Sequence, residues 1–149
     1  MPDTECYACV MNAQIGSLPP REAVLVEGVW RIAHAFNTSL PGWLVVVPTR
    51  HVERLDELSA DEVTPLGGLL RGATAALRAV VGCEKTYVML FAEATGFAHL
   101  HIHVVPKMSW FTDEHRGPGV FAFSARPESE WIPESERDAL AGALTDHLS

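Results

Sequence analysis

The chain has 149 residues, of which 48% are hydrophobic and 20% are charged, so it can bury a core and is too apolar to remain disordered. Its formal net charge of −8 argues against broad binding of nucleic-acid polymers, because phosphate contacts need clustered cations. A small phosphorylated ligand stays compatible with this charge, since it needs only a local cationic pocket.

Simple features of the sequence exclude further classes of protein. The sequence contains no run of about 18 apolar residues, so no transmembrane helix is expected. Residues 1–5 are acidic and lack the basic start of a signal peptide. Cysteines at positions 6, 9 and 83 are odd in number, which argues against a disulfide framework and for the reducing cytoplasm. We expect one cytoplasmic domain over residues 1–149.

The first part of the chain predicts an arm followed by three strands. Residues 1–20 end in two prolines and are expected to form an irregular N-terminal arm. Apolar and β-branched residues, separated by turn-rich stretches, then predict strands at 23–26, 29–36 and 43–47.

A helix is predicted next. Ser59 and Glu62 have the spacing of a capping box, and they precede an apolar stripe of helical period. Gly82 is a plausible C-terminal stop, and Pro65 is expected to kink the first part of the helix.

The remainder predicts two strands, a loop and a second helix. The strands are expected at 86–91 and 100–105, and residues 107–149 are expected to form a loop or lid followed by a helix that begins near Pro133. The order of these elements predicts an α+β fold with a mostly antiparallel five-stranded sheet, a central helix and a C-terminal helix.

Three of the seven histidines fall within five residues, in the segment HLHIHVV at 99–105. Side chains alternate between the two faces of a strand, so His99, His101 and His103 are expected on one face and apolar residues on the other. Neighbouring histidines would be roughly 6.7 Å apart at Cα, so a single metal could take two of them and would leave one for other work. The alternatives at this point are a solvent-facing strand, a fully histidine-ligated metal hydrolase and nucleophilic histidine chemistry.

The same segment resembles the signature of the histidine triad (HIT) family, in which histidines alternate with apolar residues. The resemblance extends upstream to Pro41 and Gly42 before an apolar strand, and to the segment around His51. It covers roughly residues 6–107. It implies the HIT-like fold and, for many members, a homodimer.

The resemblance also implies an activity. It points to a nucleotide phosphohydrolase that acts at the α-phosphate of a dinucleoside polyphosphate, a phosphoramidate or an acyl-nucleotide. His101 is implied as the nucleophile that forms a nucleotidyl-histidine, and His103 as the residue that contacts the phosphate and the leaving group. Substrate contacts are expected from Asn37, Thr95, Gly96 and Lys107.

Residues 6–9 form a C-x-x-C motif that is ambiguous by itself. It could be a pair of ordinary thiols, and a redox pair is disfavoured because no strand precedes it. Bacterial HIT proteins with the same motif imply a structural zinc site formed by Cys6, Cys9, His51 and His99. His34 is a rival ligand, and His51 could instead contact substrate.

The sequence departs from the family pattern in two places. The segment before the triad, at 91–98, lacks the usual glutamine and contains Glu93, and Trp43 stands where the family has a histidine. Trp43 is interpreted as a packing residue. These departures keep three other functions open: a nucleotidyl transferase or phosphorylase, a nucleotide-binding module with little turnover, and a metal-storage or sensing protein.

Overall fold

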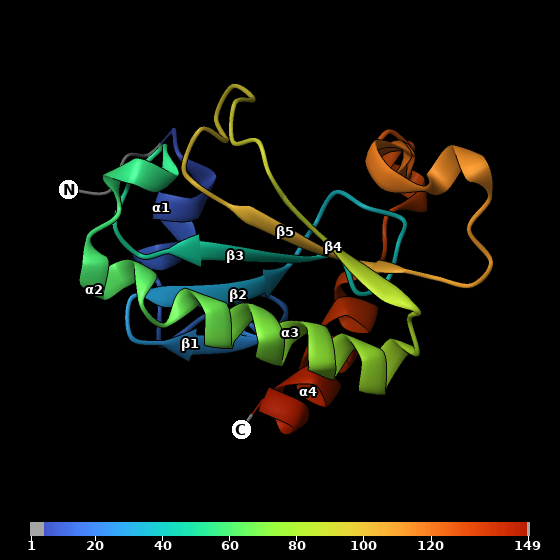
Figure 1. Cartoon of the computed structure of the whole chain (residues 1–149), viewed down its shortest axis with the longest axis horizontal. Coiled ribbons are helices and arrows are strands. Elements are labelled where there is room, and N and C mark those ends of the chain that lie inside the picture. Colours follow the sequence, from blue (N-terminus) through green and yellow to red (C-terminus); the bar gives the residue numbers. More distant parts are fainter. Residues whose placement is uncertain (1–4, 149) are drawn as a thin grey trace.

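The computed structural model describes residues 5–148 and is built on a five-stranded sheet with the order β1-β2-β3-β5-β4 (Figure 1). Every neighbouring pair of strands is antiparallel. The strands are β1 (Leu25–Glu27), β2 (Trp30–His34), β3 (Leu44–Pro48), β4 (Lys85–Leu90) and β5 (Ile102–Lys107). The predicted α+β fold with an antiparallel five-stranded sheet is confirmed.

Four α-helices accompany the sheet within residues 5–148: α1 (Tyr7–Asn12), α2 (Ala60–Val63), α3 (Leu66–Val81) and α4 (Glu134–Leu148). Short 3-10 helices join these elements: η1 (Pro20–Glu22), η2 (Leu55–Glu57), η3 (Asp113–His115), η4 (Gly117–Phe123) and η5 (Glu128–Glu130). In Figure 1 the helical segment that contains η3 and η4 lies at the end of the molecule opposite α1.

The helix that follows β3 begins as its sequence predicts. Ser59 Oγ accepts the Glu62 amide at 3.2 Å and the Glu62 carboxylate accepts the Ser59 amide at 2.8 Å, which completes the capping box. Pro65 separates α2 from α3, so the expected kink is a full break. Gly82 ends α3 with a φ of 69°, in the left-handed region that glycine adopts without strain.

The two faces of the sheet serve different purposes. One face packs against α3 and α4 in a core that includes Ile32, Leu44, Val46, Leu77, Ile102, Val104 and Leu144. Because side chains alternate along a strand, the intervening residues face the other way. Arg31, Ala33, Val45, Val47 and His103 thus line a cavity on the opposite face.

The structure differs from the sequence prediction at the N-terminal arm and at the start of the last strand. The arm was expected to be irregular, but residues 7–12 form α1 because Cys6 caps it, its Sγ accepting the Cys9 amide at 3.4 Å. The last strand was expected from residue 100, but the Leu100 amide donates to the Val52 carbonyl in a loop at 2.7 Å. The ladder of β5 therefore starts at Ile102, and His99 and His101 precede it.

Across residues 5–148, none of the helices combines the length and the apolar composition needed to cross a membrane.

Candidate functional site

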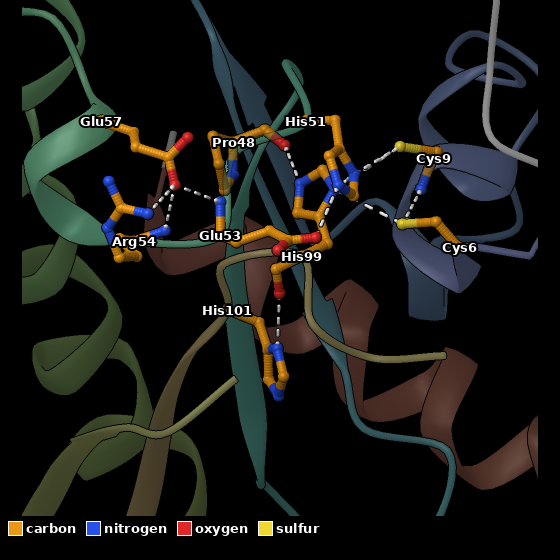
Figure 2. A network of polar contacts seen from close by, with 9 residues as sticks. All are labelled: Cys6, Cys9, Pro48, His51, Glu53, Arg54, Glu57, His99 and His101. Carbon is orange, nitrogen blue, oxygen red and sulfur yellow. Dashed lines mark hydrogen bonds and ion pairs between the residues drawn. The ribbon is translucent and has the colours of Figure 1, made fainter. Parts of the chain in front are cut away.

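Four potential metal ligands meet where α1 approaches the start of β5. The Sγ atoms of Cys6 and Cys9 both lie 3.5 Å from His99 Nδ1, and Cys9 Sγ lies 3.3 Å from His51 Nδ1. The two Nδ1 atoms are 3.2 Å apart, and all four ligand atoms lie within 4.8 Å of one another. Figure 2 shows both imidazoles pointing toward the two thiols. This set is the one that the resemblance implied.

Each histidine of the cluster is oriented through its second nitrogen. His99 Nε2 lies 2.9 Å from the Pro48 carbonyl, and His51 Nε2 lies 3.1 Å from the Glu53 carboxylate. Both acceptors favour a proton on Nε2, which leaves the Nδ1 lone pair for a metal. Burial lowers the pKa of His99 and so favours the neutral ring that a metal ligand must have.

A buried polar network fixes α1 to the sheet. Arg31 of β2 donates Nε–H to Asn12 at 2.8 Å and forms an ion pair with Glu22 at 3.1 Å, and Tyr7 donates to Glu22 at 2.7 Å. The Arg31 and Glu22 side chains are only 2% and 7% exposed. Burial and the Glu22 carboxylate raise the pKa of Tyr7. The network therefore holds the helix that carries Cys9.

All three triad histidines line one cavity of about 510 Å³, although only His103 lies in a strand. The cavity is walled mostly by apolar and aromatic side chains, including Phe36, Trp43, Val45, Phe91, Phe97 and Phe121. Its charged lining residues are Glu22, Arg31 and Glu93. Arg31 is neutralised by Glu22, so the described lining offers no unpaired cationic side chain.

The tautomer of His101 is fixed by the backbone. Its Nδ1 lies 2.8 Å from the main-chain carbonyl of His99, which can only accept a hydrogen bond (Figure 2). The proton therefore resides on Nδ1, and Nε2 carries a lone pair. A half-buried imidazole in this state has the chemistry to act as a nucleophile without a separate base.

His103 stands beside His101, with ring centroids 4.9 Å apart. Its Nδ1 accepts the indole N–H of Trp43 at 3.0 Å, and the Phe121 ring packs edge-on against it. Burial, with a smaller contribution from His101, lowers the pKa of His103 to about 4. His103 is therefore a neutral ring at ordinary pH.

The position of Trp43 depends on the turn before β3. The Gly42 amide donates to His34 Nε2 at 2.9 Å, and His34 Nδ1 donates to the Ala35 carbonyl at 2.8 Å. Gly42 has a φ of 93°, and a Cβ there would lie 3.2 Å from side-chain atoms of Leu77 and Pro106. His34 is thus a core residue outside the metal cluster, with both ring nitrogens hydrogen-bonded. It fixes the turn that positions Trp43.

The structure brings together some of the predicted substrate-contacting residues and separates others. Asn37 lines the cavity, as do both proposed catalytic histidines. Thr95 and Gly96 lie in the loop after β4 and are absent from the described lining; the Gly96 carbonyl accepts the Tyr7 amide at 3.5 Å. Lys107 lies at the far end of β5 and forms an ion pair with Glu84.

Sequence reasoning missed the role of Trp43, which it assigned to packing. The side chain is indeed 1% exposed, but its N–H reaches the triad. The signal available in the sequence was the position itself, because Trp43 stands where the resemblance expects a histidine. The cavity wall formed by Phe121 of η4 was also missed, since 107–130 was expected to be only a loop or lid.

Known structures share this fold. A Hit-like protein involved in cell-cycle regulation from Bartonella henselae matches with a TM-score of 0.73 and 16% identity over 99% of both chains. A hypothetical histidine triad nucleotide-binding protein from Sulfolobus tokodaii matches with 0.69 and 15%, over 94% of this chain and 91% of that one. A Zn-bound histidine triad family protein from Mycobacterium smegmatis matches with 0.64 and 15%, over 95% and 94%. At these identities the likeness establishes the histidine triad fold.

Comparison with the profiles of known protein families gives no match.

Proposed function

We propose that this protein is a nucleotide hydrolase that acts at the α-phosphorus of a nucleotide derivative through a covalent intermediate on His101. The observation that carries the proposal is the hydrogen bond from His101 Nδ1 to the His99 carbonyl, 2.8 Å long. It leaves the other ring nitrogen as the nucleophile, on a residue that lines a cavity large enough for a nucleotide.

The reaction proceeds in two displacements. The Nε2 lone pair of His101 attacks the α-phosphorus, and the bond from phosphorus to the leaving group breaks with its electron pair on the leaving group. The intermediate is a cationic ring that bears the nucleotidyl group on Nε2 and keeps its Nδ1 proton. Water then attacks phosphorus, the P–N pair returns to Nε2, and the proton lost by water passes to solvent. Two such steps replace one difficult step.

Other residues of the cavity bind and orient the substrate. His103 donates its Nε2–H to a phosphate oxygen or to the leaving group. Asn37, which is exposed at the cavity, is suited to hydrogen bonding with the ribose. The apolar wall accommodates the base, since aromatic side chains such as Phe36 and Phe97 offer flat faces. The similar structure from Sulfolobus tokodaii is described as a nucleotide-binding protein, which supports a nucleotide as the ligand of this cavity.

The proposed metal is zinc, held by Cys6, Cys9, His51 and His99. A tetrahedral zinc with bonds of about 2.1 Å to nitrogen and about 2.3 Å to sulfur separates two nitrogens by about 3.4 Å and a nitrogen from a sulfur by about 3.6 Å. The cluster distances of 3.2 Å and 3.3–3.5 Å fit that geometry. Four protein ligands leave no open position for water, so the metal supplies structural cross-linking.

We also propose a homodimer formed through β4. This strand is an edge of the sheet, and its Val88 and Leu90 side chains are 50% and 38% exposed. An uncovered apolar edge is stabilised by pairing with a second copy. Sedimentation of the wild-type protein and of Val88→Lys tests the proposed dimer. The wild-type protein should be a dimer, and the variant, with a charge on this edge, should be a monomer.

The decisive experiment detects the intermediate. The wild-type protein is mixed with adenosine and guanosine derivatives and quenched in alkali, and intact-mass measurement is used to find a nucleotidyl adduct. His101→Ala should remove the adduct and preserve the fold, whereas His147→Ala, an exposed histidine on α4, should change neither.

The same experiment separates the alternatives. Nucleotide binding without adduct or turnover would contradict hydrolysis and identify a binding module. An adduct that resolves onto an acceptor other than water would identify a transferase. A chain that binds zinc reversibly and no nucleotide would be a metal sensor.

A further inference from the structure

The contact between Trp43 and His103 fixes where the protons of His103 reside. An indole nitrogen can only donate, so His103 Nδ1, 3.0 Å from Trp43 Nε1, must present a lone pair. The single proton of the neutral ring is then on Nε2. A second proton on Nδ1 would face the indole N–H directly.

Trp43 has no room to turn away from this contact. Its side chain is 1% exposed, its ring packs edge-on against Phe121 at 5.4 Å, and its carbonyl accepts the Ala35 amide at 2.8 Å. The preceding Gly42 is anchored on His34. Burial of His103 acts in the same direction, since it lowers the pKa of that ring to about 4.

We infer that Trp43 is a positioning residue that holds His103 as a neutral Nε2–H donor, and that the site therefore favours nucleotide derivatives whose leaving group departs as an anion, above all acyl-nucleotides. This inference rests on the proposed function. A neutral imidazole N–H can donate a hydrogen bond to a departing oxygen, but its proton is far too weakly acidic to be transferred to an amine.

The described lining of the cavity holds no substitute acid. Glu22 is paired with Arg31, and Glu93 is an exposed carboxylate. The Tyr7 hydroxyl also lines the cavity, but it donates to Glu22, and burial raises its pKa, so it is a poor acid. His101 is the nucleophile and uses its Nδ1 proton on the His99 carbonyl. The remaining histidines are committed elsewhere: His34 has both ring nitrogens hydrogen-bonded to the main chain, and His99 belongs to the metal cluster.

The chemistry of the leaving group then decides between substrate classes. When His101 displaces the acyl group of an acyl-nucleotide, the P–O bond breaks and its electron pair leaves as a carboxylate, which needs no proton. When it displaces an amine from a phosphoramidate, the P–N bond breaks and the nitrogen requires a proton that this site lacks. A polyphosphate also leaves as an anion, but its charges would enter a cavity whose two carboxylates outnumber its one cation, Arg31.

The first test is spectroscopic. In ¹⁵N-labelled wild-type protein at pH 7, His103 should show a protonated Nε2 and an unprotonated Nδ1. Trp43→Phe keeps an aromatic ring but removes the donor, so its His103 should become a mixture of tautomers. A wild-type His103 that carries its proton on Nδ1, or on both nitrogens, would overturn the inference.

The second test is kinetic. Three classes of adenosine substrate are compared: an acyl adenylate, a series of phosphoramidates with amines of falling basicity, and a diadenosine polyphosphate. General acid catalysis contributes roughly 10²–10⁴-fold, so the wild-type kcat/KM should favour the acyl adenylate over alkyl phosphoramidates by about 100-fold or more. The phosphoramidate rates should rise steeply as the amine becomes less basic. Polyphosphate should be the poorer of the two anionic leaving groups.

Variants show whether Trp43 causes this preference. Trp43→His restores a side chain that can pass a proton and should narrow the acyl-to-alkylamine ratio by about 10-fold or more. Trp110→Phe, at an exposed tryptophan outside the cavity, should leave the ratio unchanged. An unchanged ratio in Trp43→His, or a wild-type protein that prefers alkyl phosphoramidates or polyphosphates, would overturn the inference.

If no nucleotide forms an adduct on His101, the proposed function fails and the substrate preference fails with it. The spectrum of His103 still decides the positioning role of Trp43 in that case.

Discussion

The ring of His101 is oriented by the backbone of His99, whose own ring belongs to the metal cluster: His101 Nδ1 lies 2.8 Å from the His99 carbonyl, and His99 Nδ1 lies 3.5 Å from both cysteine sulfurs. One residue thus connects the proposed nucleophile to the proposed metal. Only Leu100 separates His99 from His101 in the chain, so a shift of His99 moves the acceptor that sets the His101 tautomer. Loss of the metal is therefore expected to affect both stability and chemistry.

Removing one thiol ligand should release the metal and weaken adduct formation on His101. We expect Cys9→Ser to contain little zinc and to lose about 4 kcal/mol of the free energy of unfolding that the metal supplies at a thousandfold excess over its Kd. Elemental analysis, thermal unfolding and the adduct assay check this. Cys83→Ala is the matched control, because Cys83 is a buried thiol of the α3 core. A Cys9→Ser protein that keeps one zinc per chain would contradict the cluster.

The Glu53 carboxylate should tune the metal affinity without binding the metal. It accepts a hydrogen bond from His51 Nε2 at 3.1 Å, and loss of such outer partners costs about 10–100-fold in affinity. Glu53→Ala should raise the zinc Kd by that factor in a chelator competition. Asp56→Ala removes a nearby exposed carboxylate that accepts hydrogen bonds from Arg54, and it should leave the Kd unchanged. Equal changes of the zinc Kd in both variants would show that the affinity depends on surface charge and not on the hydrogen bond to His51.

The buried ion pair beneath α1 should be costly to break from one side. Glu22→Gln removes the charge that compensates Arg31, which is 2% exposed, so we expect a loss of about 3 kcal/mol in the free energy of unfolding. Chemical denaturation of the wild-type and variant proteins measures this difference in the free energy of unfolding. Glu130→Gln breaks the exposed pair with Arg126 and should cost at most about 0.5 kcal/mol. A small effect of Glu22→Gln would show that Arg31 finds another partner.

Acid should destabilise the protein through His34. Burial, together with Arg137, holds the pKa of His34 at about 4, below its usual 6.5. The unfolded chain therefore binds a proton on this residue at a higher pH than the folded chain does. Stability is fully present above about pH 6.5 and is lost as pH falls toward 4, by up to about 3 kcal/mol.

The contribution of His34 can be isolated with one substitution. His34→Gln keeps a donor and an acceptor but does not titrate, so its unfolding free energy should fall less between pH 7 and pH 5 than that of the wild-type protein. The comparison is made on metal-loaded protein at pH values where zinc remains bound. Parallel pH curves for the two proteins would rule out His34 as the source of acid sensitivity.

The sequence predicted the sheet well because local patterns determined it. Alternation predicted the two faces of the strand that became β5, a run of apolar and β-branched residues predicted β3, and the Ser59–Glu62 pattern marked the start of a helix. The extent of β5 was not predictable, because it depends on the Leu100 amide binding Val52, a contact with a distant loop. α1 was missed for a similar reason, since a helix of six residues is stabilised by its packing and its metal-ligand cap rather than by propensity.

The resemblance predicted the types of residue in the site better than it predicted where each residue lies. Lys107 has the right chemistry for a phosphate, but four strand residues beyond His103 place it roughly 13 Å farther along the sheet, where it pairs with Glu84. Trp43 shows the reverse case. Its residue type suggests packing alone. Its N–H meets an imidazole because Trp43 directly precedes β3, in which Val45 pairs with His103.

The position of the metal cluster has a consequence for ion exchange. Its ligands come from segments 42, 48 and 93 residues apart, yet two of the four belong to α1 and its cap. When zinc is bound, it can escape without global unfolding if α1 alone detaches, which requires the contacts of Asn12 with Arg31 and of Tyr7 with Glu22 to open. We therefore expect the exchange rate of a bound zinc ion to report the rate at which α1 opens locally. That rate depends on the buried charges of Arg31 and Glu22, which do not contact the metal cluster.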